Sequence, residues 1–366
     1  MQGQGAIGHT ITFVFEADLT EPIRGRRLGV GHLDRPVPGT VLLSYDQRRR
    51  WVLYVPVQPE HVRDFTDEDC VDMVRTAIGV PDLPVSILPQ LADGTKVLNY
   101  DVAAQVADRF QVGRVLVIGD AAHLMPQTGA FGAGTGIADA HNLAWKLAAV
   151  VNGHADPVLL DSYDVERRPV AELTVEQALL RLRERTDAAP PGESTPAERQ
   201  ATLAERESSL AELDYYATVL GYRYQSTATV GADDKLPVAL EPRRLAGQPG
   251  TRAPHIRLAG NNGTASTLDL FGDGFVMLTG ARGQHWCVAA REAAAELDVS
   301  VAAYRIGADV VDVENKWPST YQVGDDGAVL VRPDGFVAWR AESAVADQHR
   351  ALVENALRLV LGRSGK

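Results

Sequence analysis

The chain has only two cysteines among 366 residues, and no uninterrupted apolar run of the ~18 to 20 residues that a membrane span needs. Cys70 and Cys287 lie far apart, and neither belongs to a CxxC or Cys/His cluster. This spacing argues against a disulfide framework and a zinc site, so we expect two buried or half-buried thiols and no metal. The first residues, Met1 to Gly5, show neither the basic start nor the apolar stretch of a signal peptide, which favours a cytoplasmic location.

Positive charge is also scarce, because 36 Lys and Arg residues stand against 48 Asp and Glu residues, for a net charge of -12. An acidic surface repels phosphate backbones and anionic lipid headgroups, so neither nucleic acid nor a membrane is an expected partner. Apolar residues at 45% and charged residues at 23% are ordinary for a globular protein. The length is sufficient for two or three domains.

A dinucleotide-binding unit is missing from the start of the chain, although Gly3 to Gly8 satisfies the GxGxxG pattern. That pattern binds a pyrophosphate only when it follows a strand and opens a helix. Here only Met1 and Gln2 precede it, and the β-forming run Thr10 to Phe15 follows. We therefore predict that this motif does not bind a dinucleotide.

Three early segments rich in β-formers predict an antiparallel sheet: residues 9–18, 40–45 and 51–57. In the third segment one face carries Trp51, Leu53, Val55 and Val57, and this face either covers a substrate chamber or packs in a core, with packing favoured. The hairpin ends in three arginines, Arg48, Arg49 and Arg50. They either attract an acidic substrate or form a solvated turn, and the solvated turn is the favoured interpretation. Thr66 begins a helix with Asp69 as its capping-box partner.

The middle of the chain predicts a strand, a glycine-rich turn and two long helices. Arg114 to Ile118 indicates a short buried strand, and a second helix follows from about Pro157 through Arg185. Residues 188–192 form a loop, and Thr195 restarts a helix. The first helix is amphipathic, with an apolar stripe of Ile137, Ala140, Ala144, Leu147, Ala148 and Val151.

A linker rich in proline, glycine and charge at residues 241–250 separates a C-terminal domain. Its predicted strands are residues 275–278, 299–306 and 327–331, and its predicted helices are residues 288–297 and 349–361.

The glycine-rich turn indicates a ligand site. Gly119 and Asp120 end the predicted strand, where α/β sheets place their ligands, and Asp120 can accept hydrogen bonds from ligand hydroxyls. Gly129, Gly132, Gly134 and Gly136 leave the main chain uncovered at a helix start, which favours electron-rich or anionic atoms. The alternative is a tight turn alone, but four glycines within eight residues favour the ligand site.

These residues carry a family resemblance. GDAAH, then PQTGAFGAGTG, then DAHNLAWKL and LLDSYDVERRPVA resemble the second FAD-contacting segment of class A flavoprotein monooxygenases, the para-hydroxybenzoate and phenol hydroxylase type. The resemblance implies that Asp120 holds the ribityl chain and that the carbonyl of Pro126 faces the reactive side of the flavin. The backbone facing the N1 and O2 edge of the ring belongs to Gly132, Ala133, Gly134, Thr135 and Gly136. Gly119 and Gly129 complete the implied cofactor-binding set.

The resemblance also implies a mixed α/β and α+β fold with three parts. Residues 1–105 resemble the substrate-covering antiparallel sheet, residues 106–240 the C-terminal part of the FAD-binding domain with its long helices, and residues 241–366 a thioredoxin-like domain. Cys287 stands without a second thiol, so this last domain is expected to be structural or to form a homodimer rather than to be redox-active.

The activity implied is hydroxylation of a phenolic or polycyclic aromatic substrate, with FAD and NAD(P)H as cofactors and O2 as co-substrate. His123 is either a base or a hydrogen-bonding residue of the motif, and the second is favoured. Gly134 stands where family members usually have asparagine, and the GxGxxG unit is absent. Three explanations remain open: a cut fragment, which is favoured; a shortened protein acting as a binding or oligomerisation remnant; or a separate polypeptide that supplies the missing half.

Overall fold

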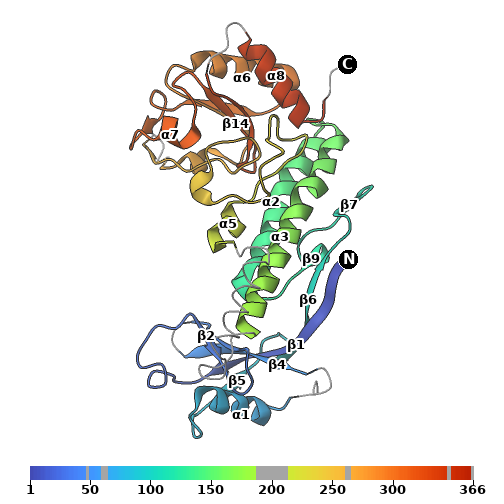
Figure 1. Cartoon of the computed structure of the whole chain (residues 1–366), viewed down its shortest axis with the longest axis vertical. Coiled ribbons are helices and arrows are strands. Elements are labelled where there is room, and N and C mark those ends of the chain that lie inside the picture. Colours follow the sequence, from blue (N-terminus) through green and yellow to red (C-terminus); the bar gives the residue numbers. More distant parts are fainter. Residues whose placement is uncertain (47–48, 59–64, 187–212, 260–264, 344–347, 364–366) are drawn as a thin grey trace, which may run out of the picture.

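The computed structural model describes residues 1–46, 49–58, 65–186, 213–259, 265–343 and 348–363. The molecule is elongated, with a large sheet at one end, two long helices in the middle and the C-terminal domain at the other end (Figure 1). The predicted loop at 188–192, the helix restart at Thr195 and the side chain of Arg48 lie outside the described residues. No helix in the described part of the chain has the length and apolar character of a membrane span.

The large sheet is antiparallel, as predicted, with the order β2-β3-β4-β1-β6-β9 and with β5 paired to β1. Its strands are β1 (Gln2–Glu16), β2 (Val30–Leu33), β3 (Thr40–Ser44), β4 (Arg50–Val57), β5 (Ser86–Leu88), β6 (Val97–Val106) and β9 (His123–Leu124). The GxGxxG motif lies inside β1 and pairs with β6, with bulges at its glycines. It opens no helix, so it lacks the structural context that a dinucleotide loop requires.

Helix α1 (Asp67–Ile78) covers one face of this sheet. Thr66 caps it, and the Thr66 and Asp69 side chains each accept from the other residue's backbone N–H, which is the predicted capping box. Cys70 and Val74 of α1 belong to one buried cluster with the predicted strand face, namely Trp51, Leu53 and Val55. That face therefore packs in a core, which is the alternative that the sequence favoured, and does not cover a substrate chamber.

The predicted buried strand at residues 114–118 is wrong. The structure has a short hairpin of β7 (Gln111–Val112) and β8 (Val115–Leu116), followed by the 3-10 turn η2 (Gly119–Ala121). Val115 is 67% exposed and Ile118 is 42% exposed. Within the described residues β8 pairs only with β7, so this apolar segment has no larger sheet in which to be buried.

The two predicted long helices are present as α2 (Phe131–Val151) and α3 (Asp161–Thr186), with η3 (Thr128–Ala130) before α2 and η4 (Pro157–Leu160) before α3. They lie side by side (Figure 1). Helix α2 starts at Phe131, so the glycines at 132, 134 and 136 lie within its first turns and not in a turn before it.

Most of the predicted apolar stripe of α2 faces outward, whereas its Leu147 packs against a buried cluster. Ile137 is 71% exposed and Val151 is 80% exposed. Beside the apolar Phe131 and Leu143, the buried face of the helix carries four polar side chains: Thr135, Asp139, Asn142 and Lys146. Helical spacing indicated the two faces correctly, but it could not indicate which of them packs against the rest of the chain.

The C-terminal domain has a four-stranded sheet in the order β12-β11-β14-β15. Strands β11 (Phe275–Thr279) and β12 (Val301–Arg305) are parallel and joined by α6 (Gln284–Leu297), while β14 (Ala328–Val331) and β15 (Val337–Ala341) form an antiparallel hairpin before α8 (His349–Val360). The thioredoxin-like interpretation of this region stays a prediction. Smaller elements are α5 (Tyr215–Leu220), η5 (Pro242–Arg244), β10 (Leu258–Ala259), η6 (Thr267–Leu270), β13 (Val311–Asp312) and α7 (Trp317–Tyr321).

Candidate functional site

The turn at Gly119 packs directly against the first turns of α2. A Cβ atom on Gly136 would lie 3.1 Å from the Cα of Gly119, which is tighter than an ordinary contact. Gly119 also has a φ of +57°, in the left-handed region that favours glycine. The two glycines therefore bring the Asp120 turn and the start of α2 together.

The surface beside this contact is open. The Asp120 side chain is exposed and accepts no hydrogen bond from any described residue. Helix α2 has no side-chain cap at Ala130, so the N–H groups of Phe131, Gly132 and Ala133 have no partner within the helix. A Cβ on Gly134 would meet no atom within 4 Å. A free carboxylate thus lies near uncovered amides at the positive end of a long helix, which suits a ligand with hydroxyl groups and an electron-rich edge.

The loop before α2 is held in place at three points. Thr128 is buried, and its hydroxyl donates to the carbonyl oxygen of Ala178 on α3 at 2.6 Å. Gly129 has a φ of +82°, and a Cβ there would lie 2.3 Å from the ring of Phe131. Gln127 donates to the hydroxyl of Tyr100 on β6. Pro126 is buried within this constrained loop.

Behind the turn, Asp139 of α2 binds three groups. Its Oδ2 accepts from the Gly119 N–H at 3.1 Å and lies 2.7 Å from His123 Nε2, while its Oδ1 accepts from Arg167 Nε at 2.7 Å. Burial acts to raise the pKa of Asp139, but the hydrogen bond from His123 and the charge of Arg167 outweigh it and lower the pKa. His123 is 1% exposed, so the favoured interpretation of this residue as a hydrogen-bonding member of the motif is confirmed.

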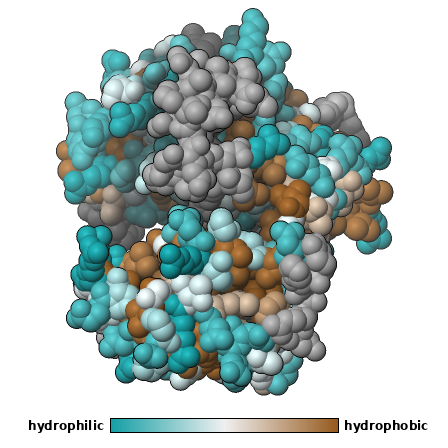
Figure 2. Space-filling view, turned by 60° about the horizontal axis from the view of Figure 1, so that its bottom comes forward, coloured by the Kyte–Doolittle hydropathy of each residue, from teal (hydrophilic) through white to brown (hydrophobic). Residues whose placement is uncertain are grey.

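The sheet face opposite α1 continues this site. Thr10 pairs with Tyr100, and Thr12 pairs with Tyr54, so these four side chains share one face. Burial raises the pKa of Tyr100 to about 12, so its phenol stays neutral near pH 7. Thr12 Oγ1 is buried without a hydrogen-bond partner among the described residues. Figure 2 shows the molecule with its sheet end turned forward, and apolar residues there reach the surface between hydrophilic ones.

The arginine-rich hairpin end is not part of this site. Arg49 is exposed and makes a 3.7 Å ion pair with Glu16, and Arg50 is exposed as well. The described part of this segment is therefore a solvated turn, as favoured.

The sequence interpretation missed the charged residues behind the loop. Asp139, Asn142 and Lys146 are spaced by three and four residues on one helix, which places them on one face. That spacing was the available signal, but the apolar stripe on the other face was the stronger pattern. Glu166 and Arg167 stand in the quoted VERRPVA segment, and no role was predicted for either.

Comparisons with known proteins agree with this geometry. Residues 1–178 match the FAD binding domain family, and residues 246–364 match the aromatic-ring hydroxylase, C-terminal family. The chain is 39% identical to 4-methyl-5-nitrocatechol 5-monooxygenase from Burkholderia sp and 40% identical to a putative polyketide hydroxylase from Streptomyces halstedii; the alignments cover 99% and 98% of this chain and 65% and 64% of those proteins.

A solved structure of aklavinone-11 hydroxylase with FAD and aklavinone superposes with a TM-score of 0.85 at 36% identity, covering 99% of this chain and 64% of that one. This chain therefore spans just under two thirds of the length of these relatives. The matches extend over both the sheet-and-helix part and the C-terminal domain. The chain belongs to the FAD-dependent aromatic hydroxylases of the class A flavoprotein monooxygenases.

Proposed function

We propose that this chain forms the flavin-ring and substrate side of a monooxygenase that hydroxylates a phenolic or polycyclic aromatic compound with NAD(P)H and O2. The observation that carries the proposal is the exposed Asp120 carboxylate beside the uncapped start of α2. FAD, when bound and reduced, would supply the activation of O2. The chain's own residues bind and orient the reactants.

The open surface supports the following proposed role for each group. Asp120 would accept hydrogen bonds from the ribityl hydroxyls, since no described residue competes for its carboxylate. The amides of Gly132 and Ala133 would stabilise negative charge at the ring edge, because the helix dipole adds to their hydrogen bonds. The backbone at Gly129, Gly134, Thr135 and Gly136 would complete this wall, and the family resemblance assigns the Pro126 carbonyl to the reactive side of the ring.

The substrate side is the sheet face of Thr12, Tyr54 and Tyr100. It is joined to the Pro126 loop by the contact between Tyr100 and Gln127, so a ring lying there would be next to the flavin position. Tyrosine rings bind aromatic compounds, and the Thr12 hydroxyl has an unused hydrogen-bonding capacity. The named relatives act on a nitrocatechol or carry the name polyketide hydroxylase, which supports an aromatic substrate with ring hydroxyls.

The adenine and pyrophosphate half of FAD needs a further unit. The GxGxxG match at Gly3 to Gly8 lies inside β1 and opens no helix, whereas a pyrophosphate site requires this motif at the start of a helix. The outward apolar side chains Val115, Ile118, Ile137 and Val151 are each at least 42% exposed and would be covered by such a unit. It would be either a preceding part of the same polypeptide or a separate chain.

The test uses this chain alone and then together with the dinucleotide-binding segment of a relative. We expect weak FAD binding by the chain alone, and a bound-flavin spectrum with substrate-dependent NAD(P)H oxidation for the combined protein across a panel of phenols and polycyclic aromatics. Asp120→Ala should lose most of the flavin, while the control Asp72→Ala on α1 should retain it. A combined protein without turnover of any aromatic would leave only a binding or oligomerisation role.

A further inference from the structure

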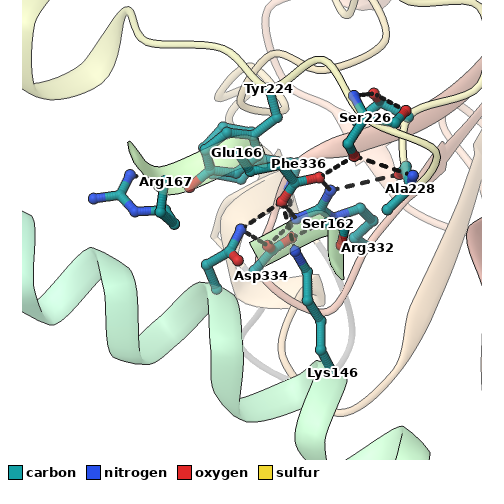
Figure 3. A network of polar contacts seen from close by, with 12 residues as sticks. Lys146, Ser162, Glu166, Arg167, Tyr224, Ser226, Ala228, Arg332, Asp334 and Phe336 are labelled. Carbon is teal, nitrogen blue, oxygen red and sulfur yellow. Dashed lines mark hydrogen bonds and ion pairs between the residues drawn. The ribbon is translucent and has the colours of Figure 1, made fainter. Parts of the chain in front are cut away.

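Charged side chains fill the contact between the C-terminal domain and the long helices (Figure 3). Three are basic and three are acidic, and each is at most 5% exposed: Asp139, Lys146, Glu166, Arg167, Arg332 and Asp334. Burying an ion costs several kcal/mol unless it is well paired, and an apolar contact of similar volume is often as stable. Adhesion between the domains alone would not require these charges.

Arg332 of the C-terminal domain binds Glu166 of α3 through two parallel bonds. Its two terminal nitrogens donate to Glu166 Oε1 at 2.6 Å and to Oε2 at 3.0 Å. Asp334 holds the other side of the guanidinium, where it accepts from Arg332 Nε at 3.0 Å. A two-point contact fixes both the distance and the angle between the groups. Lys146 and Asn142 of α2 donate to the same carboxylate at 2.8 and 2.7 Å. Glu166 therefore connects α2, α3 and the C-terminal domain.

The five residues 332–336 form the tight turn between β14 and β15. Arg332 N–H donates to the Phe336 carbonyl at 2.8 Å, and Gly335 N–H donates to the Arg332 carbonyl at 2.9 Å. Gly335 has a φ of +77°, which favours glycine. The Phe336 ring stacks on Tyr224 at a centroid distance of 4.1 Å. One rigid turn thus presents both a guanidinium and an aromatic ring to the helices.

Both contacts of this turn lead to Arg167. Glu166 is its neighbour on α3, and the Tyr224 hydroxyl accepts from Arg167 at 3.3 Å. Arg167 in turn donates to Asp139 at 2.7 Å and to the carbonyl of Thr135, in the second turn of α2, at 3.1 Å. Asp139 then accepts from the Gly119 N–H. The network therefore ends on the backbone at both sides of the candidate flavin loop.

We propose that the turn at residues 332–336 is a positioning element for the flavin loop. Arg332 and Phe336 fix Arg167, and Arg167 and Asp139 set the position of Gly119 and Thr135 relative to one another. A shift of α3 by one turn would leave buried charges unpaired, so the network allows one register only. The identification of this loop as the flavin loop rests on the function proposed above, whereas the coupling itself does not.

The test is amide hydrogen exchange on the full 366-residue chain without flavin. In Arg332→Gln we expect amides of residues 117–124 to exchange roughly tenfold faster, while β11 and β14 keep their protection. The control is Arg305→Gln, because Arg305 pairs with Asp309 inside the C-terminal domain and should leave residues 117–124 unchanged. Faster exchange limited to residues 222–228 and 332–336 would mean that the turn only joins the domains, and would overturn the proposal.

A second variant covers the case in which Arg332→Gln does not fold. Phe336→Leu keeps every charge and removes the stacking on Tyr224, and it should accelerate exchange in residues 117–124 to a smaller extent; no acceleration there would overturn the proposal. In the combined FAD-binding protein, Arg332→Gln should also raise the Kd for FAD relative to Arg305→Gln. If no flavin binds to any form, the function proposed above fails, while the exchange result still decides the coupling.

Discussion

Gly136 on α2 lies so close to the Gly119 turn that a Cβ atom added to it would come within 3.1 Å of the Gly119 Cα. Gly136→Ala should therefore push the two segments apart and cost about 1 to 3 kcal/mol in the free energy of unfolding. Gly134→Ala is the matched control, since its Cβ meets no atom within 4 Å and alanine favours a helix by about 0.5 to 1 kcal/mol. Urea unfolding of both variants measures the difference. Equal stabilisation by the two substitutions would contradict the close approach.

The buried carboxylate of Glu166 gives a pH-dependent prediction. Burial acts to raise its pKa, but the charges of Arg332 and Lys146 outweigh burial and hold the pKa well below its ordinary value of 4.5. The stabilisation is therefore fully present above pH 4.5 and is lost as the pH falls through the lower folded value. Glu166→Gln should cost about 3 to 5 kcal/mol at pH 7 because it leaves buried cations without their partner.

The difference in unfolding free energy between wild type and Glu166→Gln should shrink as the pH falls from 4.5 toward 2. Urea midpoints across this range measure it. Glu172→Gln, on the exposed part of the same helix, is the control and should change stability by less than about 1 kcal/mol at every pH. A constant difference between wild type and Glu166→Gln would show that the carboxylate is not held in its charged form.

Local patterns in the sequence predicted the elements well. The alternation in residues 51–57, the box at Thr66 and Asp69 and the periodicity of the two long helices each depend on neighbours close in sequence. The exposure of β8 and the orientation of α2 were predicted wrongly, because both depend on which segments pack against them. The contacts of Arg332 with Glu166 join residues 166 positions apart, and no local spacing signals such a pair.

The free thiols should be unreactive in the folded protein. Cys70 is fully buried, and Cys287 is 1% exposed. Burial raises the pKa of Cys70 to about 11 and also raises that of Cys287, so little thiolate forms at pH 8. Titration with a thiol-specific disulfide reagent should detect no rapidly reacting group before denaturant is added and two afterwards. One fast thiol in the native chain would contradict the packing of either α1 or α6.

A substitution on the outward-facing side of α2 should affect FAD binding in the combined protein but not the stability of this chain. Ile137 is 71% exposed, so Ile137→Lys should change the unfolding free energy of this chain by no more than about 0.5 kcal/mol. In the combined protein the lysine would be buried beneath the dinucleotide-binding unit, and FAD retention should fall at least tenfold. Glu176→Lys on α3 places the same charge away from the stripe and serves as control. FAD retention equal in both variants would mean that the added unit does not cover α2, and the apolar face would then need a different partner, such as a second copy of the chain.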